Sequence, residues 1–182
     1  MIQFLLTGLL ALQVLVASAQ SAPAMSARPL AVSSASSPMR AHALRLHPGD
    51  DLRQQLLRFV EGQHLKAGAV LTCVGSLTTT TLRLANQEGP TVYHGHFEIV
   101  SLVGTLSVNG SHLHLSVADS TGRTIGGHLL DGNIIYTTAE IVLGELPELD
   151  FRRETDATYG YKELSVHPAD DKPRKAPRAG RK

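Results

Sequence analysis

Turn signals at regular intervals constrain the fold of this chain most strongly. Between residues 92 and 146, β-prone segments are separated by Asn109-Gly110, by a turn that contains Gly122, and by Asp131-Gly132-Asn133. Asn-Gly is a strong signal for a tight β-hairpin, and Gly supplies the positive φ that short hairpin loops need. The pattern therefore predicts a run of antiparallel strands. They are expected at 92–108 (one strand, or two divided by a kink at Gly104), 112–118, 124–130 and 134–146.

A helix is expected near the start of the patterned region. Asp50 fits the N-cap position, and apolar residues with helical spacing follow it to about Gln63. Strand-type segments lie on either side of this helix, at 40–46, 69–74 and 78–85. One early helix combined with mostly antiparallel strands predicts an α+β fold, with a single domain over residues 39–168.

The N-terminal segment differs from this body. Residues 2–16 are almost continuously apolar and Ala17-Ser18-Ala19 fits a signal-peptidase site, yet no Lys or Arg precedes the apolar run. Residues 1–19 are therefore either a secretory signal cleaved near Ala19, or an organellar presequence or artefactual extension. The run is shorter than the roughly 20 residues of a transmembrane helix, so stable membrane insertion is not expected. Residues 20–38 are rich in Ser, Ala and Pro, which is typical of a disordered linker.

Residues 169–182 are expected to be a disordered basic tail. Its basic residues are Lys172, Arg174, Lys175, Arg178, Arg181 and Lys182. Without these six, only 11 of the chain's 17 basic residues remain, against 16 acidic ones, so the body is acidic. The body alone is thus a poor electrostatic binder of nucleic acid. The tail is either a solvated end, a nuclear-targeting segment or a contact for an anionic partner such as nucleic acid.

Composition directs attention to histidine. The single cysteine, Cys73, excludes an intramolecular disulfide and any zinc site built from several thiolates. The chain has no Trp, only 4 Phe and 4 Tyr, which argues against a surface that stacks successive bases. Nine histidines are many for 182 residues, so any chemistry visible in the sequence should involve imidazole.

Three of these histidines are predicted to converge. His112 and His114 are two residues apart and therefore share one face of a strand. A three-residue loop with Gly122 at its left-handed position sets a register in which His114 lies opposite His128. His112 is then diagonal to His128 on the same face, within reach of one shared ion.

Several interpretations of this cluster stay open. His112, His114 and His128 could bind one divalent metal such as zinc, with an open coordination position. They could instead be solvent-facing or interface histidines, or act in acid–base catalysis without metal. Glu98 and Glu140 are either polar partners of the imidazoles or carboxylates that only form structural hydrogen bonds.

Several motifs in order and spacing resemble the PPC domain, whose name means conserved in plants and prokaryotes. They are residues 75–77, 95–102, 104–105, 112–116, Asp119, Gly122, 126–130 and 137–141. The resemblance spans residues 40–167. It implies an α+β fold around a strongly bent antiparallel sheet with one main N-terminal helix, and a homotrimer.

The family also suggests partners. Plant members follow AT-hook segments in nuclear DNA-binding proteins and contact nuclear protein partners through a Gly-Arg-Phe-Glu-Ile-Leu motif. The matching residues here are Gly95, His96, Phe97, Glu98, Ile99 and Val100. His96 stands where the plant motif has Arg, and no Arg-Gly-Arg-Pro hook is present.

The sequence therefore predicts a trimeric binding or assembly module, associated with DNA or DNA-binding partners. The alternative is a small metal-dependent enzyme or ligand binder that uses the three histidines. The resemblance favours an intracellular protein, whereas the N-terminal pattern favours secretion.

Overall fold

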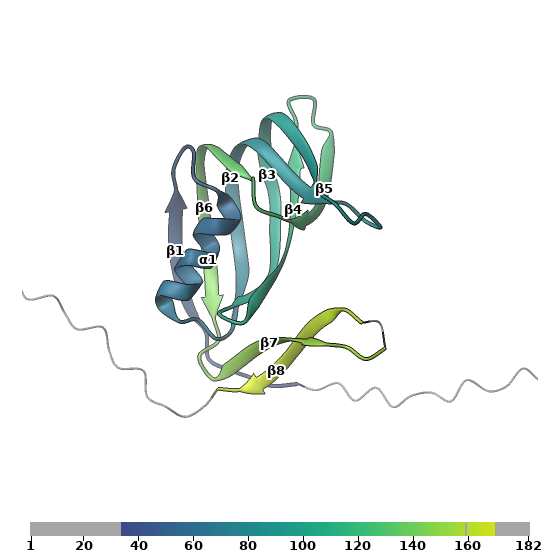
Figure 1. The fold of residues 1–182 in the computed structure, drawn as a ribbon. Helices are drawn as coiled ribbons and strands as arrows, with labels where there is room; N and C mark the ends of the chain where they lie inside the picture. The colour runs from purple at the N-terminus through teal and green to yellow at the C-terminus, as the bar shows by residue number, and fades with distance from the viewer. Residues whose placement is uncertain (1–33, 159, 170–182) are drawn as a thin grey trace, which may run out of the picture. The chain divides into compact units, whose positions relative to one another are not determined.

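The computed structural model describes residues 34–158 and 160–169 (Figure 1). The expected signal or presequence at 1–19, most of the expected linker and the basic residues of the tail lie outside the described residues. Residues 34–39 form neither helix nor strand. No helix among the described residues is long and apolar enough to cross a membrane.

One helix and eight strands make up the described chain. They are β1 (Arg40–Leu46), α1 (Leu52–Gln63), β2 (Gly68–Arg83), β3 (Thr91–Ser107), β4 (Gly110–Ala118), β5 (Thr124–Leu129), β6 (Ile134–Glu145), β7 (Leu149–Thr155) and β8 (Lys162–Pro168). Six strands form one sheet in the order β1-β6-β2-β3-β4-β5, and β7 and β8 form a separate hairpin. All of the strand pairs are antiparallel, which confirms the predicted α+β class.

The main sheet bends until two of its strands meet a second time. The C-terminal end of β2 pairs with β5, with Leu82 opposite Leu129 and Arg83 opposite His128. Gly127 makes this approach feasible, because a Cβ there would lie 2.8 Å from the Arg83 carbonyl oxygen. The contact places the end of β2 beside the β4–β5 hairpin (Figure 1).

The helix α1 covers one part of the sheet with an apolar stripe. Leu52, Leu56 and Val60 are buried at intervals of four residues and join the core of the sheet. Burying a side chain of this size contributes roughly 2 kcal/mol. The N-cap is Asp51, whose side chain accepts from the Gln54 N–H, so the expectation of Asp50 was wrong by one residue.

The predicted hairpins are present. Ser107 pairs with Gly110, so the β3–β4 loop is Val108-Asn109, one residue earlier than the Asn109-Gly110 signal indicates. The segment at 92–108 is one strand, with a bulge near Val100 and not a break at Gly104. The segments at 69–74 and 78–85 likewise belong to the single strand β2, which ends at Arg83 and contains register shifts.

The β7–β8 hairpin was not recognised in the sequence. It packs through Leu149 and Phe151 against Ala67 in a small second core. Asn109 ties it to the main sheet, because its side-chain amide donates to Asp150 Oδ1 and to the Phe151 carbonyl, both at 2.9 Å. The hairpin is thereby held near β4.

Candidate metal centre

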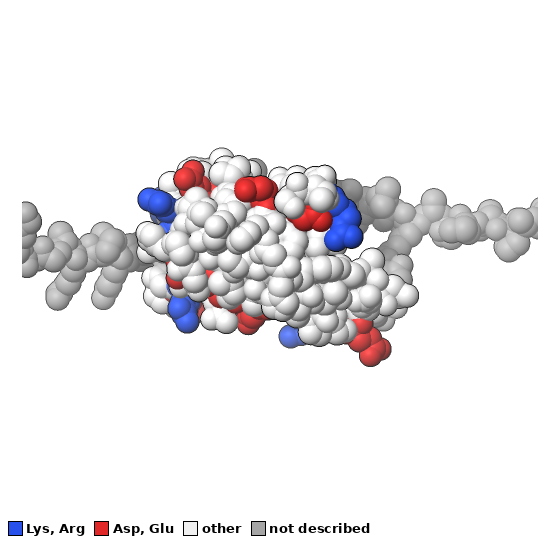
Figure 2. All heavy atoms as spheres, turned by 90° about the horizontal axis from the view of Figure 1, so that it is seen from above, with Lys and Arg blue, Asp and Glu red and all other residues white. Residues whose placement is uncertain are grey.

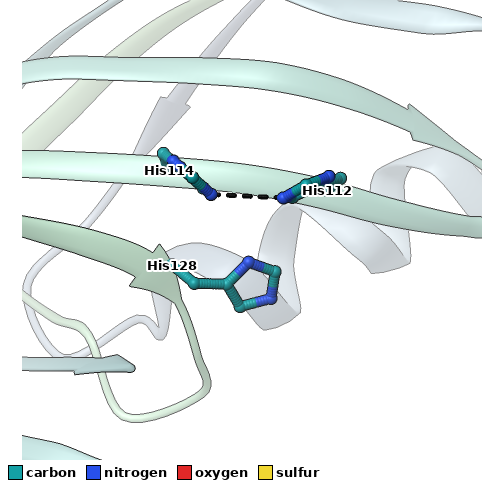
Figure 3. Close-up of side chains that lie close together, drawn as sticks. All are labelled: His112, His114 and His128. Atoms are coloured by element: carbon teal, nitrogen blue, oxygen red, sulfur yellow. Dashed lines mark hydrogen bonds between the residues drawn. The ribbon is translucent and has the colours of Figure 1, made fainter. Parts of the chain in front are cut away.

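Three imidazoles meet on the outward face of the β4–β5 hairpin (Figure 3). One ring nitrogen from each of His112, His114 and His128 lies within 4.8 Å of the other two. The Nε2 atoms of His112 and His114 are 3.2 Å apart, and the His128 ring lies across from both. No other group of three metal-ligating side chains occurs in the part of the chain that the structure describes.

Local backbone structure explains the convergence. The Asp119 N–H donates to the Arg123 carbonyl, and Gly122 closes the loop with a φ of 82°. His114 then lies directly opposite His128, which confirms the predicted register. On the opposite face of the hairpin, Leu113, Leu115, Val117 and Leu129 are buried in the core. The hairpin therefore cannot slip by one residue without exposing these side chains.

The surroundings of two of the imidazoles favour the neutral form. The pKa of His128 is lowered to about 4, first by burial and then by the positive charge of Arg83. The pKa of His112 is also lowered, by burial and by Arg153, whereas the Glu163 carboxylate acts in the opposite direction. A neutral imidazole has a free lone pair, which is the form that ligates metals.

A pocket of about 400 Å³ opens beside two of the histidines. Its lining residues include His114 and His128, Gly126 and Gly127, and Arg83 and Asn86. The two glycines leave one wall without side chains. A small ligand could therefore reach the histidine cluster from this side.

The structure does not bring the two glutamates to the cluster. Glu98 lies on β3 opposite Ala118 and Ser76, and Glu140 lies on β6 opposite Arg45 and Val74. Both are exposed, and within the described ranges no hydrogen bond or ion pair joins either carboxylate to the histidines.

The segment from Gly95 to Val100 forms part of β3. Phe97 and Ile99 point into the core, whereas His96, Glu98 and Val100 are exposed. The His96 ring stacks on Tyr136 of β6, with ring centroids 4.3 Å apart. The exposed side chains of the motif thus face outward from the sheet.

Two residues near the site were not predicted from the sequence. Arg83 lies opposite His128 through the β2–β5 contact. Asn133 is fully buried and makes four hydrogen bonds, three of which join the end of β2 to the β5–β6 connection. The Asp131-Gly132-Asn133 turn was visible in the sequence, but nothing indicated that its asparagine would be buried.

The model of the Plants and Prokaryotes Conserved (PCC) domain matches residues 33–147, which is most of the chain and includes all three histidines. This chain belongs to the PCC, or PPC, domain family. The β7–β8 hairpin follows the matched region.

PPC-domain relatives occur within longer proteins. The chain is 51% identical over 130 residues to the bifunctional protein GlmU of Synechococcus sp. (strain JA-2-3B'a(2-13)), covering 71% of this chain and 21% of that protein. It is 31% identical over 115 residues to the AT-hook motif nuclear-localized protein 13 of Arabidopsis thaliana, covering 57% of this chain and 26% of that protein. The chain thus spans about a quarter or less of the length of these relatives.

Solved structures share the fold over most of their length. A hypothetical protein from Salmonella enterica matches with a TM-score of 0.73 and 46% identity, covering 74% of this chain and 97% of that one. A metal-containing protein from Archaeoglobus fulgidus matches with a TM-score of 0.61 and 23% identity, covering 69% and 93%. The second likeness concerns the fold alone.

Proposed function

We propose that this PPC-domain chain is a metal-stabilised ligand-binding module, in which His112, His114 and His128 hold one divalent first-row metal ion. The observation that carries the proposal is the meeting of three imidazole nitrogens within 4.8 Å of one another. Three histidine ligands with an open fourth position suit zinc.

The state of the His128 ring supports this proposal. Its Nδ1 atom is buried and has no hydrogen-bond partner among the described residues. An unpaired buried nitrogen costs stability, and a bound metal ion would remove that cost. Figure 3 displays one ring nitrogen of His128 on the side that faces the other two rings.

Other features point the same way. The protein from Archaeoglobus fulgidus with the same fold is described as metal-containing. When bound in such a site, a metal polarises an oxygen ligand or a water at its open position. The adjoining pocket gives a small ligand access to that position.

Cobalt(II) titration of the metal-free full chain tests the proposal. Its visible spectrum reports the coordination geometry, and competition with zinc gives the zinc affinity. We expect one ion per chain. His128→Ala should weaken metal binding by more than about 100-fold. This loss exceeds the one seen when only a residue that hydrogen-bonds to a metal ligand is replaced. His94→Ala is the matched control, because His94 lies on β3 outside the cluster. Equal affinities in the two variants would contradict the proposal.

A homotrimer is a second proposal, supported by exposed apolar side chains on the neighbouring strands β2, β3 and β6. They are Leu71, Val74, Val100, Val103 and Tyr136. Apolar side chains on the outward face of a sheet favour association with another protein surface. The proposed occupant is a second and third copy of the chain, as the family resemblance implies.

Light scattering at micromolar concentration tests this assembly. We expect a trimer that persists in high salt, because apolar contacts are not screened. Val100→Lys should dissociate it, whereas Leu164→Lys, an exposed position on the β7–β8 hairpin, should not. A wild-type monomer would overturn the proposal.

Association with nucleic acid is proposed for the basic tail and not for the body. The plant relative is named for an AT-hook motif and nuclear localisation. The face of the body in Figure 2 carries basic and acidic side chains in small separate groups, with no continuous basic patch among the described residues seen there. Salt-dependent DNA retention that disappears on deletion of residues 172–182 would support this role. Retention that survives the deletion would contradict it.

A further inference from the structure

Positive charge predominates around the proposed metal site, because Arg83 and Arg153 lie close enough to act on the histidines and Glu163 opposes them on the His112 side. Three imidazoles bring no negative charge, and no carboxylate belongs to the group among the described residues. Arg83 lies on the neighbouring strand directly opposite His128, so the two side chains share one face of the sheet. A divalent ion would therefore lie beside a guanidinium with no carboxylate ligand to offset its charge, and an anion between the two would relieve the repulsion.

The pocket offers a place for such an anion. Arg83, His114 and His128 line it together. Asn86 also lines the pocket, from the loop after β2, where its backbone has the left-handed φ of 59°. The Arg83 guanidinium has no hydrogen bond or ion pair with any other described residue, so its donors are available to a ligand.

We propose that this pocket binds an oxyanion, the carboxylate or phosphate group of a small molecule, between the metal ion and Arg83. The inference rests on the proposed metal site and specifies its ligand. One oxygen of the anion occupies the coordination position that three histidines leave open. The other oxygens accept hydrogen bonds from the guanidinium, whose planar fork suits carboxylates and phosphates. Asn86, which also lines the pocket, has a side-chain amide that can donate further hydrogen bonds.

Anion titration of the cobalt-loaded full chain tests this site. Inorganic phosphate and acetate serve as probes. Their binding is measured by calorimetry and by the change in the visible spectrum of the cobalt ion. We expect at least one probe to bind and to change the spectrum, and the probe that binds more tightly identifies the ligand class. Arg83→Gln should weaken that binding by about tenfold or more, as expected for the loss of charge-assisted hydrogen bonds.

Arg123→Gln is the matched control, because it also removes one positive charge. Arg123 lies in the loop of the β4–β5 hairpin, away from the histidines, and pairs with Asp119. It should change anion affinity by less than about twofold. Arg83→Gln should also bind the metal at least as tightly as the wild type in a weakly coordinating salt, because a positive charge beside the ion is gone. A merely structural role of Arg83 would instead weaken both metal and anion binding.

The outcomes separate the two proposals. A chain that takes up no cobalt overturns the metal site itself. A cobalt-loaded chain that binds neither probe, or that binds both equally well with and without Arg83, overturns only the oxyanion site.

Discussion

Replacing Asn133 by alanine should destabilise the fold through the strand end that carries Arg83. The Asn133 side chain is fully buried, and all four of its hydrogen-bonding positions are used. Its oxygen accepts from the Thr80 hydroxyl at 2.8 Å and the Thr81 N–H at 3.0 Å. Its nitrogen donates to the carbonyls of Thr81 at 2.9 Å and Leu130 at 2.7 Å.

The magnitude follows from the burial of these partners. Three of the four hydrogen bonds are buried, and the one to Leu130 is partly buried, so water can replace that one most easily. An intramolecular hydrogen bond between neutral groups contributes about 1 kcal/mol, and a buried group left unpaired costs about 1–3 kcal/mol. Asn133→Ala should therefore lower the free energy of unfolding by about 3 kcal/mol.

Urea denaturation followed by circular dichroism measures this change. With a denaturant dependence of about 2 kcal/mol per molar urea, the midpoint should fall by about 1.5 M. Gln54→Ala, at an exposed position of α1, should change the free energy by no more than about 0.5 kcal/mol. A loss of less than about 1 kcal/mol in Asn133→Ala would refute the reasoning, because the network would then contribute little beyond what water provides.

Three further changes have defined outcomes. Leu56→Ala should cost about 2–5 kcal/mol in the same urea assay, because Leu56 is buried where α1 meets the sheet. Since the pKa of His128 is lowered to about 4, the unfolded metal-free chain binds more protons between roughly pH 6.5 and 4, and stability should fall as pH drops through that range. His128→Gln should make the thermal stability depend less on pH over this range. A pH dependence equal to that of the wild type would contradict the role of His128. Asn109→Ala removes two hydrogen bonds to β7 and should speed amide hydrogen exchange there, whereas unaltered exchange would show that Asn109 does not hold the hairpin.

The local parts of this structure were predictable from the sequence. Turn chemistry at Gly122 sets the β4–β5 register, and the register brings His128 opposite His114. The alternating apolar residues of the same hairpin identify its core face. Both inferences succeed because the loop residues set the register of a hairpin, and because side chains along a strand alternate between its two faces.

The long-range parts were not predictable in this way. The contact of Arg83 with His128 depends on how strongly β2 and the β4–β5 hairpin bend toward each other, which no local pattern encodes. Asp50 and Asp51 are adjacent and both are suitable N-cap residues, and only the structure shows that Asp51 accepts from the Gln54 N–H. Whether Glu98 and Glu140 lie near the histidines depends on the pairing of β3 and β6 with other strands, and this pairing holds both glutamates elsewhere in the sheet.

Elemental analysis of the full chain, purified without added metal, tests the proposed metal centre most directly. We predict about one first-row metal ion per chain in the wild type and in His94→Ala, and little metal in His114→Ala and His128→Ala, whose side chains lie opposite each other across the hairpin. Wild-type protein without metal, or metal retained equally by the His114→Ala and His128→Ala variants, would contradict the three-histidine site.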